Sequence, residues 1–121
     1  METKKTYFFI GINGIGMSGL AEILVKSGHN VSGSDSSPNL DIEKFEQLGI
    51  NVFKNHNKDN INSKMIIIYS SAIPETNEEF IQAKSLGCQI IKRGTFLAQL
   101  SLDFKKRVAI AGTHGKTTTT S

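Results

Sequence analysis

The stretch YFFIGINGIGMSGLAE, residues 7–22, combines a short apolar run, a glycine-rich turn and the first turns of a helix. Tyr7–Ile10 is continuously apolar, which is typical of a strand covered on both faces. Apolar residues at helical spacing resume at Leu20. A helix that starts there points its unpaired N–H groups and the positive end of its dipole back toward the turn. The stretch therefore predicts a strand, turn and helix that together can bind an anion.

The glycine spacing matches the dinucleotide-binding pattern only in part. Counted from the end of the strand, the pattern needs a glycine where the chain has Asn13; counted from Gly14, it is complete with Gly16 and Gly19 but shifted into the helix. Asn tolerates a left-handed backbone, so Asn13 is compatible with the turn. Asp35 follows the next predicted strand. This context favours a nucleotide or phosphate site over a turn that uses glycine for packing alone.

The bulk composition is that of an ordinary globular protein. The chain has 121 residues, a formal charge of +3, 38% hydrophobic residues and 21% charged residues, which fits one domain with a real core. Its lysines are scattered, and the dense basic stripe of a nucleic-acid-binding protein is absent. A single cysteine, Cys88, excludes an internal disulfide and favours a reducing, cytoplasmic location. We expect no membrane insertion, because no apolar stretch is long enough to span a bilayer.

Strand and helix patterns alternate along the rest of the chain. Strands are expected at 30–34, 51–53, 65–69, 89–91 and 107–111, and helices at 40–48, 77–85 and 95–102. This alternation predicts an α/β fold, a Rossmann-like open parallel sheet with helices on both faces. Ligands of such sheets bind at the carboxyl ends of the strands. Gly11–Gly16, Asp35, Ser70–Ser71 and Arg93–Gly94 all follow predicted strands, so we expect them to line one site.

A second phosphate loop, GTHGKTT at residues 112–118, follows the last predicted strand. Backbone N–H groups of such a loop wrap phosphate oxygens, while the Lys116 ammonium meets the outer phosphates and the Thr117 hydroxyl ligates Mg²⁺. The loop is shorter than the common phosphate loop, which would have a glycine at Ile110. His114 is interpreted as a solvent-facing residue.

Only a few residues follow this loop before the chain ends at Ser121. We therefore expect a Rossmann-like domain at 1–104, and the first strand and phosphate loop of a truncated, nucleotide-hydrolysing domain at 105–121. Because a phosphate loop without its helix loses dipole and amides, the chain alone is expected to have no ATPase activity.

The two phosphate loops together resemble those of the Mur ligase family. The matching segments are Gly11–Glu22, Gly33–Asp35, Ser70–Ile73, Arg93–Leu97 and Ala111–Thr120, with Asn13 standing where the family usually has glycine. The resemblance implies the UDP-binding part of a cytoplasmic bacterial ligase of peptidoglycan precursor synthesis. Such an enzyme uses ATP to phosphorylate the carboxylate of UDP-N-acetylmuramate, and the amine of L-alanine then attacks the acyl phosphate.

The resemblance also implies which residues meet each ligand. It places the UDP-sugar on Gly11, Asn13, Gly14, Ile15, Gly16, Met17, Ser18, Asp35, Ser70, Ser71, Ala72, Ile73 and Arg93. It places ATP on Gly112, Thr113, His114, Gly115, Lys116, Thr117 and Thr118, with Lys116 as the catalytic residue and Thr117 as the ligand of Mg²⁺. The glycine loop would meet the diphosphate through its amides, and Asp35 and the turn at 70–73 would lie near the nucleoside.

Other interpretations remain open at this stage. The chain could belong to a related ligase that recycles muropeptides, or to an NAD-binding Rossmann module in which Asp35 binds a ribose; a purely structural module is a third. Each site residue also has a local alternative: Asp35 as a turn cap, Ser70–Ser71 as turn formers and Arg93 as a solvated residue at a helix start. We interpret His56 as a surface or packing residue.

Overall fold

The computed structural model describes residues 4–14 and 16–112, and the side chains as far as residue 102. Its centre is a five-stranded sheet in the order β3-β2-β1-β4-β5, with every neighbouring pair parallel. The strands are β1 (Thr6–Ile10), β2 (Asn30–Ser34), β3 (Asn51–Phe53), β4 (Ile66–Tyr69) and β5 (Gln89–Lys92). The helices are α1 (Met17–Lys26), α2 (Ile42–Gln47), α3 (Glu78–Leu86) and α4 (Arg93–Gly112), with a 3₁₀ turn η1 (Lys58–Asn60). The predicted Rossmann-like parallel sheet is confirmed.

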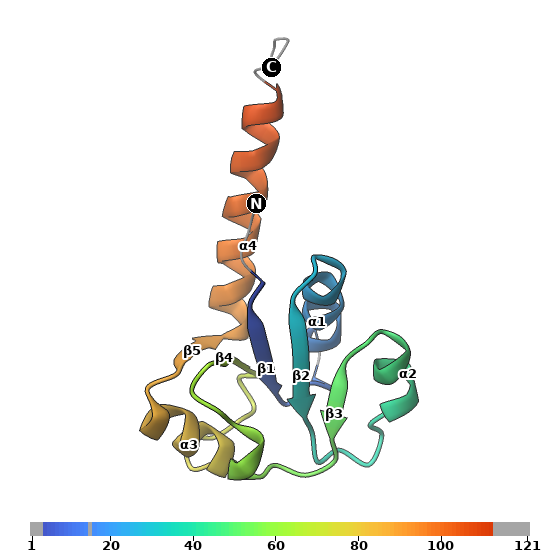
Figure 1. The fold of residues 1–121 in the computed structure, drawn as a ribbon, viewed down its shortest axis with the longest axis vertical. Coiled ribbons are helices and arrows are strands. Elements are labelled where there is room, and N and C mark those ends of the chain that lie inside the picture. The colour runs from blue at the N-terminus through green and yellow to red at the C-terminus, as the bar shows by residue number, and fades with distance from the viewer. Residues whose placement is uncertain (1–3, 15, 113–121) are drawn as a thin grey trace.

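The strand order reverses beside β1. The chain runs outward from β1 through β2 to β3, then crosses to the other side of β1, where β4 and β5 follow. In Figure 1 the arrows of β1, β2 and β3 point toward the lower part of the molecule. Because β4 pairs in parallel with β1, with Tyr69 opposite Ile10, the carboxyl ends of β1 and β4 lie side by side. This reversal is the point of a doubly wound sheet at which ligands bind.

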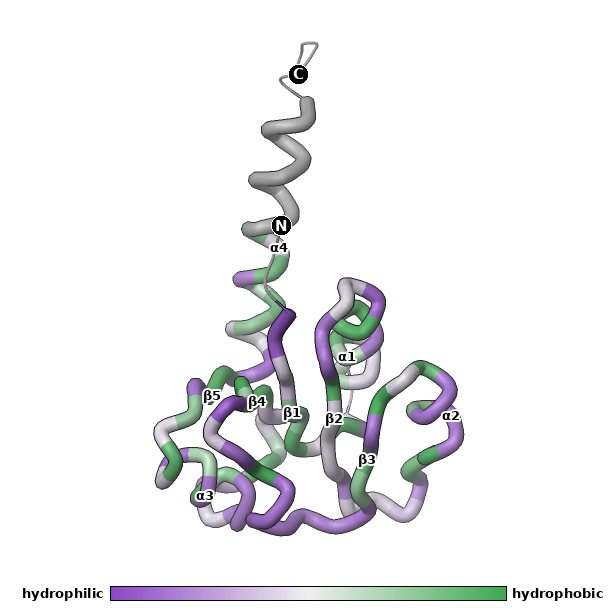
Figure 2. The backbone as a smooth tube through the Cα atoms, viewed as in Figure 1, coloured by the Kyte–Doolittle hydropathy of each residue, from purple (hydrophilic) through white to green (hydrophobic). Residues whose placement is uncertain are grey.

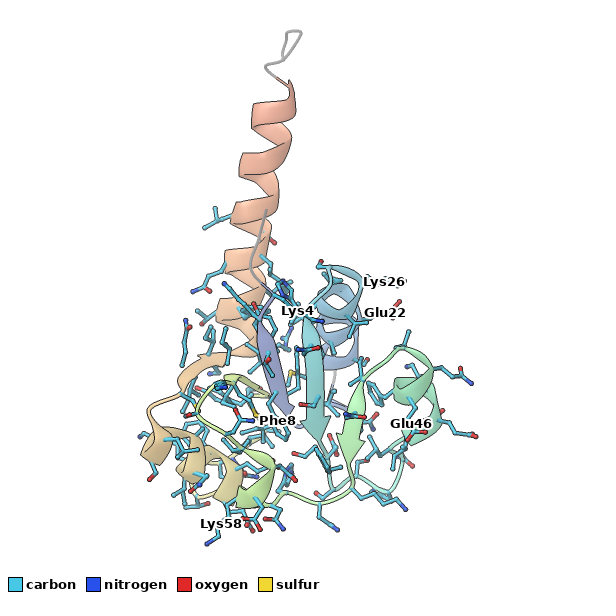
Figure 3. All side chains as sticks on the ribbon, in the orientation of Figure 1. Lys4, Phe8, Glu22, Lys26, Glu46 and Lys58 are labelled. Atoms are coloured by element: carbon cyan, nitrogen blue, oxygen red, sulfur yellow. The ribbon has the colours of Figure 1, made fainter. Side chains whose placement is uncertain are left out.

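Each face of the sheet carries its own core, because successive side chains of a strand point to opposite faces. Tyr7 and Phe9 pack with residues of α1, α2 and α4 on one face. Phe8 and Ile10 pack with α3 on the other face. Phe8 is fully buried and lies in the interior in Figure 3, whereas Glu22 and Lys26 form an ion pair on the surface of α1. Helices on both faces are therefore confirmed.

The segment 107–111 corrects the sequence prediction, because it is helical and not a strand. A single helix, α4, continues from Arg93 to Gly112, through the predicted helix 95–102 and the predicted strand beyond it. A strand needs a neighbour for its backbone N–H and C=O groups, and neither β3 nor β5, the edges of the described sheet, pairs with this segment. A helix satisfies those groups internally, and the alanines, leucines and lysines of 98–111 are good helix formers.

Helix α4 begins against the sheet and then leaves it. Phe96 and Leu100 pack on the same core as Tyr7, whereas Leu102 is largely exposed. Figure 1 shows the rest of the helix backbone rising away from the sheet. The helix crosses residues 104 and 105 without a break, so the boundary expected there stays a prediction. No helix in the described part of the chain is both long and apolar enough to cross a bilayer.

Gly33 tests how closely β2 packs under the glycine turn. A methyl group added there would lie 2.7 Å from the Phe9 carbonyl oxygen and 2.8 Å from Ile12 Cδ1. We expect Gly33→Ala to lower the free energy of unfolding by about 1–3 kcal/mol, because the backbone oxygen cannot move aside. Gly19→Ala is the matched control, since a methyl group at Gly19 meets no atom within 4 Å. Urea denaturation of both variants checks this, and equal stabilities would contradict it.

Candidate functional site

The glycine turn after β1 packs against two other segments at the carboxyl ends of the strands. Gly11 and Gly16 have φ angles of +84° and +78°, in the left-handed region that favours glycine. A methyl group at Gly11 would lie 3.2 Å from Ile73 Cδ1, and one at Gly16 would lie 3.0 Å from Arg93 Nη1. The turn after β4 and the start of α4 therefore lie directly against the glycine turn.

Several amides of the turn are already bonded within the protein. Gly11 N–H and Ile12 N–H both donate to the carbonyl oxygen of Ser34, at 2.9 Å and 3.0 Å. Gly14 N–H donates to Gly11 O at 2.9 Å, and Asn13 N–H donates to Asp35 Oδ2 at 2.9 Å. These amides shape the turn, and a ligand has to use others.

The amino end of α1 offers such amides. Its N-cap is Gly16, which has no side chain to accept an N–H, and the first turn contains no acidic residue. Within the described residues, the N–H groups of Gly16 and Ser18 have no hydrogen-bond acceptor. Because a helix N-terminus carries a partial positive charge, these two donors suit an anion.

Arg93 adds a full positive charge at the same place. It is half-buried at the start of α4, and its guanidinium lies over Gly16. In the part of the chain that the structure describes, no carboxylate forms an ion pair with it. A half-buried cation beside free amides is the arrangement expected around a phosphate group.

Asp35 has a structural role that goes beyond the turn cap considered from the sequence. Its Oδ2 accepts the Asn13 amide, and its Oδ1 accepts the Ser37 amide at 2.7 Å. Its own N–H donates to Phe53 O at 3.1 Å. Asp35 thus ties the glycine turn to the ends of β2 and β3, and the local alternative of a turn cap is part of its function.

The turn at residues 70–73 is held by local hydrogen bonds. Ser70 Oγ accepts the Ala72 amide at 3.2 Å, and Ser70 O accepts the Ile73 amide at 3.0 Å. Ser70 N–H donates to Ile10 O at 3.2 Å, which fixes the turn to the end of β1. Ser71 and Ala72 are exposed at the rim. The residues that the sequence placed at strand ends are therefore brought together.

Some of the predicted site residues cannot be located. Ile15 and the ATP loop residues Thr113, His114, Gly115, Lys116, Thr117 and Thr118 lie outside the described residues. Gly112 is described, as the last residue of α4. Among the described residues, no group of three or more His, Cys, Asp or Glu side chains is arranged to hold a metal ion. The ATP and Mg²⁺ sites stay predictions from the sequence.

A cavity of about 350 Å³ lies at the other end of the sheet, lined by residues that include Thr6, Asn30 and Asn51. Thr6 and Asn30 are the first residues of β1 and β2, and Asn51 is the first residue of β3. Because ligands of parallel sheets bind at the carboxyl ends of strands, the glycine turn is the better candidate site.

A buried polar group behind the turn was not predicted from the sequence. Glu79 of α3 is fully buried and contacts Ser34 and His56. The sequence predicts His56 to be a surface or packing residue. Ser34 stands beside the conspicuous Asp35, and Glu79 lies in a polar stretch that reads as a solvated helix start. The sequence therefore gave only a weak signal for this contact.

Comparison with known proteins adds independent information. Residues 6–105 match the family model described as "Mur ligase family, catalytic domain". The UDP-N-acetylmuramate–L-alanine ligases of Hydrogenobaculum sp. (strain Y04AAS1) and Clostridium acetobutylicum are 48% and 46% identical to this chain over 120 residues. In both cases the match covers 99% of this chain and 26% of the relative. The chain thus spans about a quarter of the length of these curated relatives.

Solved structures agree with this. The UDP-N-acetylmuramate-alanine ligase from Thermotoga maritima is similar at a TM-score of 0.71 and 30% identity, over 87% of this chain and 23% of that one. The UDP-N-acetylmuramate:L-alanyl-gamma-D-glutamyl-meso-diaminopimelate ligase from Neisseria meningitides gives a TM-score of 0.70 at 25% identity, over 80% of this chain and 31% of that one.

Asp35→Asn tests whether this carboxylate holds the glycine turn. The substitution keeps the shape but removes the charge that accepts the Asn13 and Ser37 amides, so we expect the free energy of unfolding to fall by about 1–3 kcal/mol. Hydrogen exchange at the Asn13 amide should accelerate with it. Asp41→Asn makes the same change at the N-cap of α2, where Asn caps as well as Asp, and should have little effect. An unchanged Asn13 amide in Asp35→Asn would contradict the assignment.

Proposed function

The chain belongs to the Mur ligase family, and from that premise we propose that it binds UDP-N-acetylmuramate as part of an ATP-dependent ligase that joins this sugar nucleotide to L-alanine. The supporting observation is the Arg93 guanidinium over Gly16, beside amides that have no acceptor among the described residues. The names of the curated relatives support the choice of substrate and acceptor.

The proposed binding mode uses the groups that the fold leaves available. The diphosphate accepts hydrogen bonds from the amides of Gly16 and Ser18 and pairs with Arg93. Gly11 and Gly14 act by the absence of a side chain, which lets the turn at 70–73 come close. The exposed residues Ser71 and Ala72 border the nucleoside. They lie next to the glycine turn, which Asp35 holds in place through the Asn13 amide.

The chemical step needs the second loop and residues beyond it. In the proposed reaction the muramoyl carboxylate takes the γ-phosphoryl group of ATP, and the amine of L-alanine attacks the acyl phosphate. The new amide bond forms as phosphate leaves, and ADP is the other product. Lys116 would bind the ATP phosphates and Thr117 the Mg²⁺ that accompanies them, as in other phosphate loops. This part of the proposal rests on the sequence and on the family.

Two other functions, a muropeptide-adding ligase and an NAD-binding module, are weighed against the proposed one. The similarity to the Neisseria ligase supports a muropeptide-adding enzyme, which would use the same sugar-nucleotide site. An NAD-binding module is disfavoured, because residues 6–105 match the Mur ligase family and the named relatives are ligases of a UDP-sugar.

Thermal melting of the chain with UDP-N-acetylmuramate and with NAD⁺ tests the proposal. A ligand at a hundred times its Kd stabilises the folded state by about 2.7 kcal/mol, so only the true ligand should raise Tm strongly. Arg93→Gln should weaken UDP-N-acetylmuramate binding about tenfold, since a charged hydrogen bond is lost. Lys92→Gln, the same change at the exposed neighbour on β5, should leave the affinity unchanged. A Tm raised by NAD⁺ and not by the sugar nucleotide would contradict the proposal.

A further inference from the structure

Glu79 is a buried carboxylate on the side of the sheet covered by α3, and its exposed fraction is 0%. Its Oε1 accepts a hydrogen bond from the Ser34 hydroxyl and lies 2.9 Å from His56 Nδ1. Its Oε2 accepts from Asn57 N–H at 3.2 Å and from Asn60 Nδ2 at 2.8 Å. Each oxygen therefore has two polar partners, which offsets the hydration that the carboxylate loses on burial.

These partners come from separate parts of the chain. Ser34 is the last residue of β2, whereas His56, Asn57 and Asn60 belong to the segment that leads from β3 to β4. Figure 2 shows this segment as hydrophilic along the lower edge, and Lys58 marks it in Figure 3. Glu79 thus joins α3 to two segments at the carboxyl ends of the strands.

The group resembles a Ser–His–acid catalytic set in composition but not in geometry. His56 contacts Ser34 Oγ and Glu79 Oε1 through the same atom, Nδ1, at 2.8 Å and 2.9 Å. A catalytic set needs one ring nitrogen for the hydroxyl and the other for the acid. The Ser34 hydroxyl is also fully buried and donates directly to the carboxylate. Ser34 therefore cannot act as a nucleophile here.

Ser34 connects this buried group to the glycine turn. Its side chain binds Glu79, while its carbonyl oxygen accepts the N–H groups of Gly11 and Ile12. The next residue, Asp35, accepts the N–H of Asn13. A shift of the end of β2 would therefore move the acceptors of three consecutive amides in the turn.

We propose that Glu79 is a positioning residue for the UDP-sugar site, and that it acts through Ser34 to keep the glycine turn in its binding shape. The ligand in this inference rests on the proposed function, whereas the link from Glu79 to the turn is present without ligand. A carboxylate that served stability alone could take its donors from anywhere around α3. This one takes a donor from the residue whose carbonyl supports the turn.

The test compares variants of the chain in two measurements. Hydrogen exchange at the Gly11, Ile12 and Asn13 amides is followed without ligand, and the Kd for UDP-N-acetylmuramate is measured by titration. Glu79→Gln removes the charge, and Ser34→Ala removes the connection while leaving the carboxylate in place. Glu78→Gln is the matched control, because Glu78 is exposed and, among the residues that the structure describes, its side chain accepts the Lys58 amide alone. Ala83→Gly lowers the stability of α3 through a buried residue outside this group.

Glu79→Gln and Ser34→Ala should each accelerate exchange at the three amides and raise the Kd about tenfold, since each loses a hydrogen bond to a buried carboxylate. The variant that carries both Glu79→Gln and Ser34→Ala should have a Kd no higher than the higher of the two single-variant values, because both substitutions act through one connection. Glu78→Gln should change neither quantity, and Ala83→Gly should leave the Kd unchanged.

Two results would overturn the inference: unchanged exchange and Kd in Glu79→Gln, or an equal rise of Kd in Ala83→Gly. If the unsubstituted chain does not bind UDP-N-acetylmuramate but Glu79→Gln still accelerates exchange at the three amides, the link to the turn stands and the proposed function fails.

Discussion

The carbonyl oxygen of Ser34 is the acceptor on which the candidate site depends. It takes two N–H groups from the turn that leaves β1, so the direction of that turn is set by the end of the neighbouring strand. Two left-handed glycines allow the chain to follow this path, and Asp35 adds a third contact to Asn13. The result is a turn whose first amides are used internally, while the N–H groups of Gly16 and Ser18 at the start of α1 have no acceptor among the described residues.

This arrangement explains why the site needs parallel strands that reverse their order. β1 and β4 lie next to each other, so the glycine turn after β1 and the turn at 70–73 after β4 meet at one edge. β5 then delivers Arg93 to the same edge as the first residue of α4. A cation, amides without an acceptor in the described part of the chain, and backbone without side chains come together from three segments that are far apart in the sequence.

Much of the fold could be predicted from the sequence, because apolar runs such as Met65–Tyr69 and helical spacing such as Ile42, Phe45 and Leu48 have distinct periods. The prediction of a strand at 107–111 was wrong for a physical reason: a short apolar run is equally compatible with a buried strand and with part of a helix. Only the availability of a pairing neighbour decides between them, and the sequence alone does not show it.

The site was predicted in outline but not in its bonding. Glycines, Asp35 and Arg93 stand at strand ends and could be found from the alternation alone. The sequence could not show that Asp35 binds the turn itself, nor that Glu79 lies buried while its neighbour Glu78 is exposed. Such distinctions depend on which side of a helix faces the sheet, and a short polar helix start carries no periodic signal of it.

We propose that the amides at the start of α1 bind a diphosphate, and backbone amide shifts measured with UDP and with uridine test this most directly. The account predicts large shifts at Gly16 and Ser18 with UDP and almost none there with uridine, because uridine lacks the anion. Equal shifts with both compounds, or shifts with UDP that spare these two amides, would contradict it.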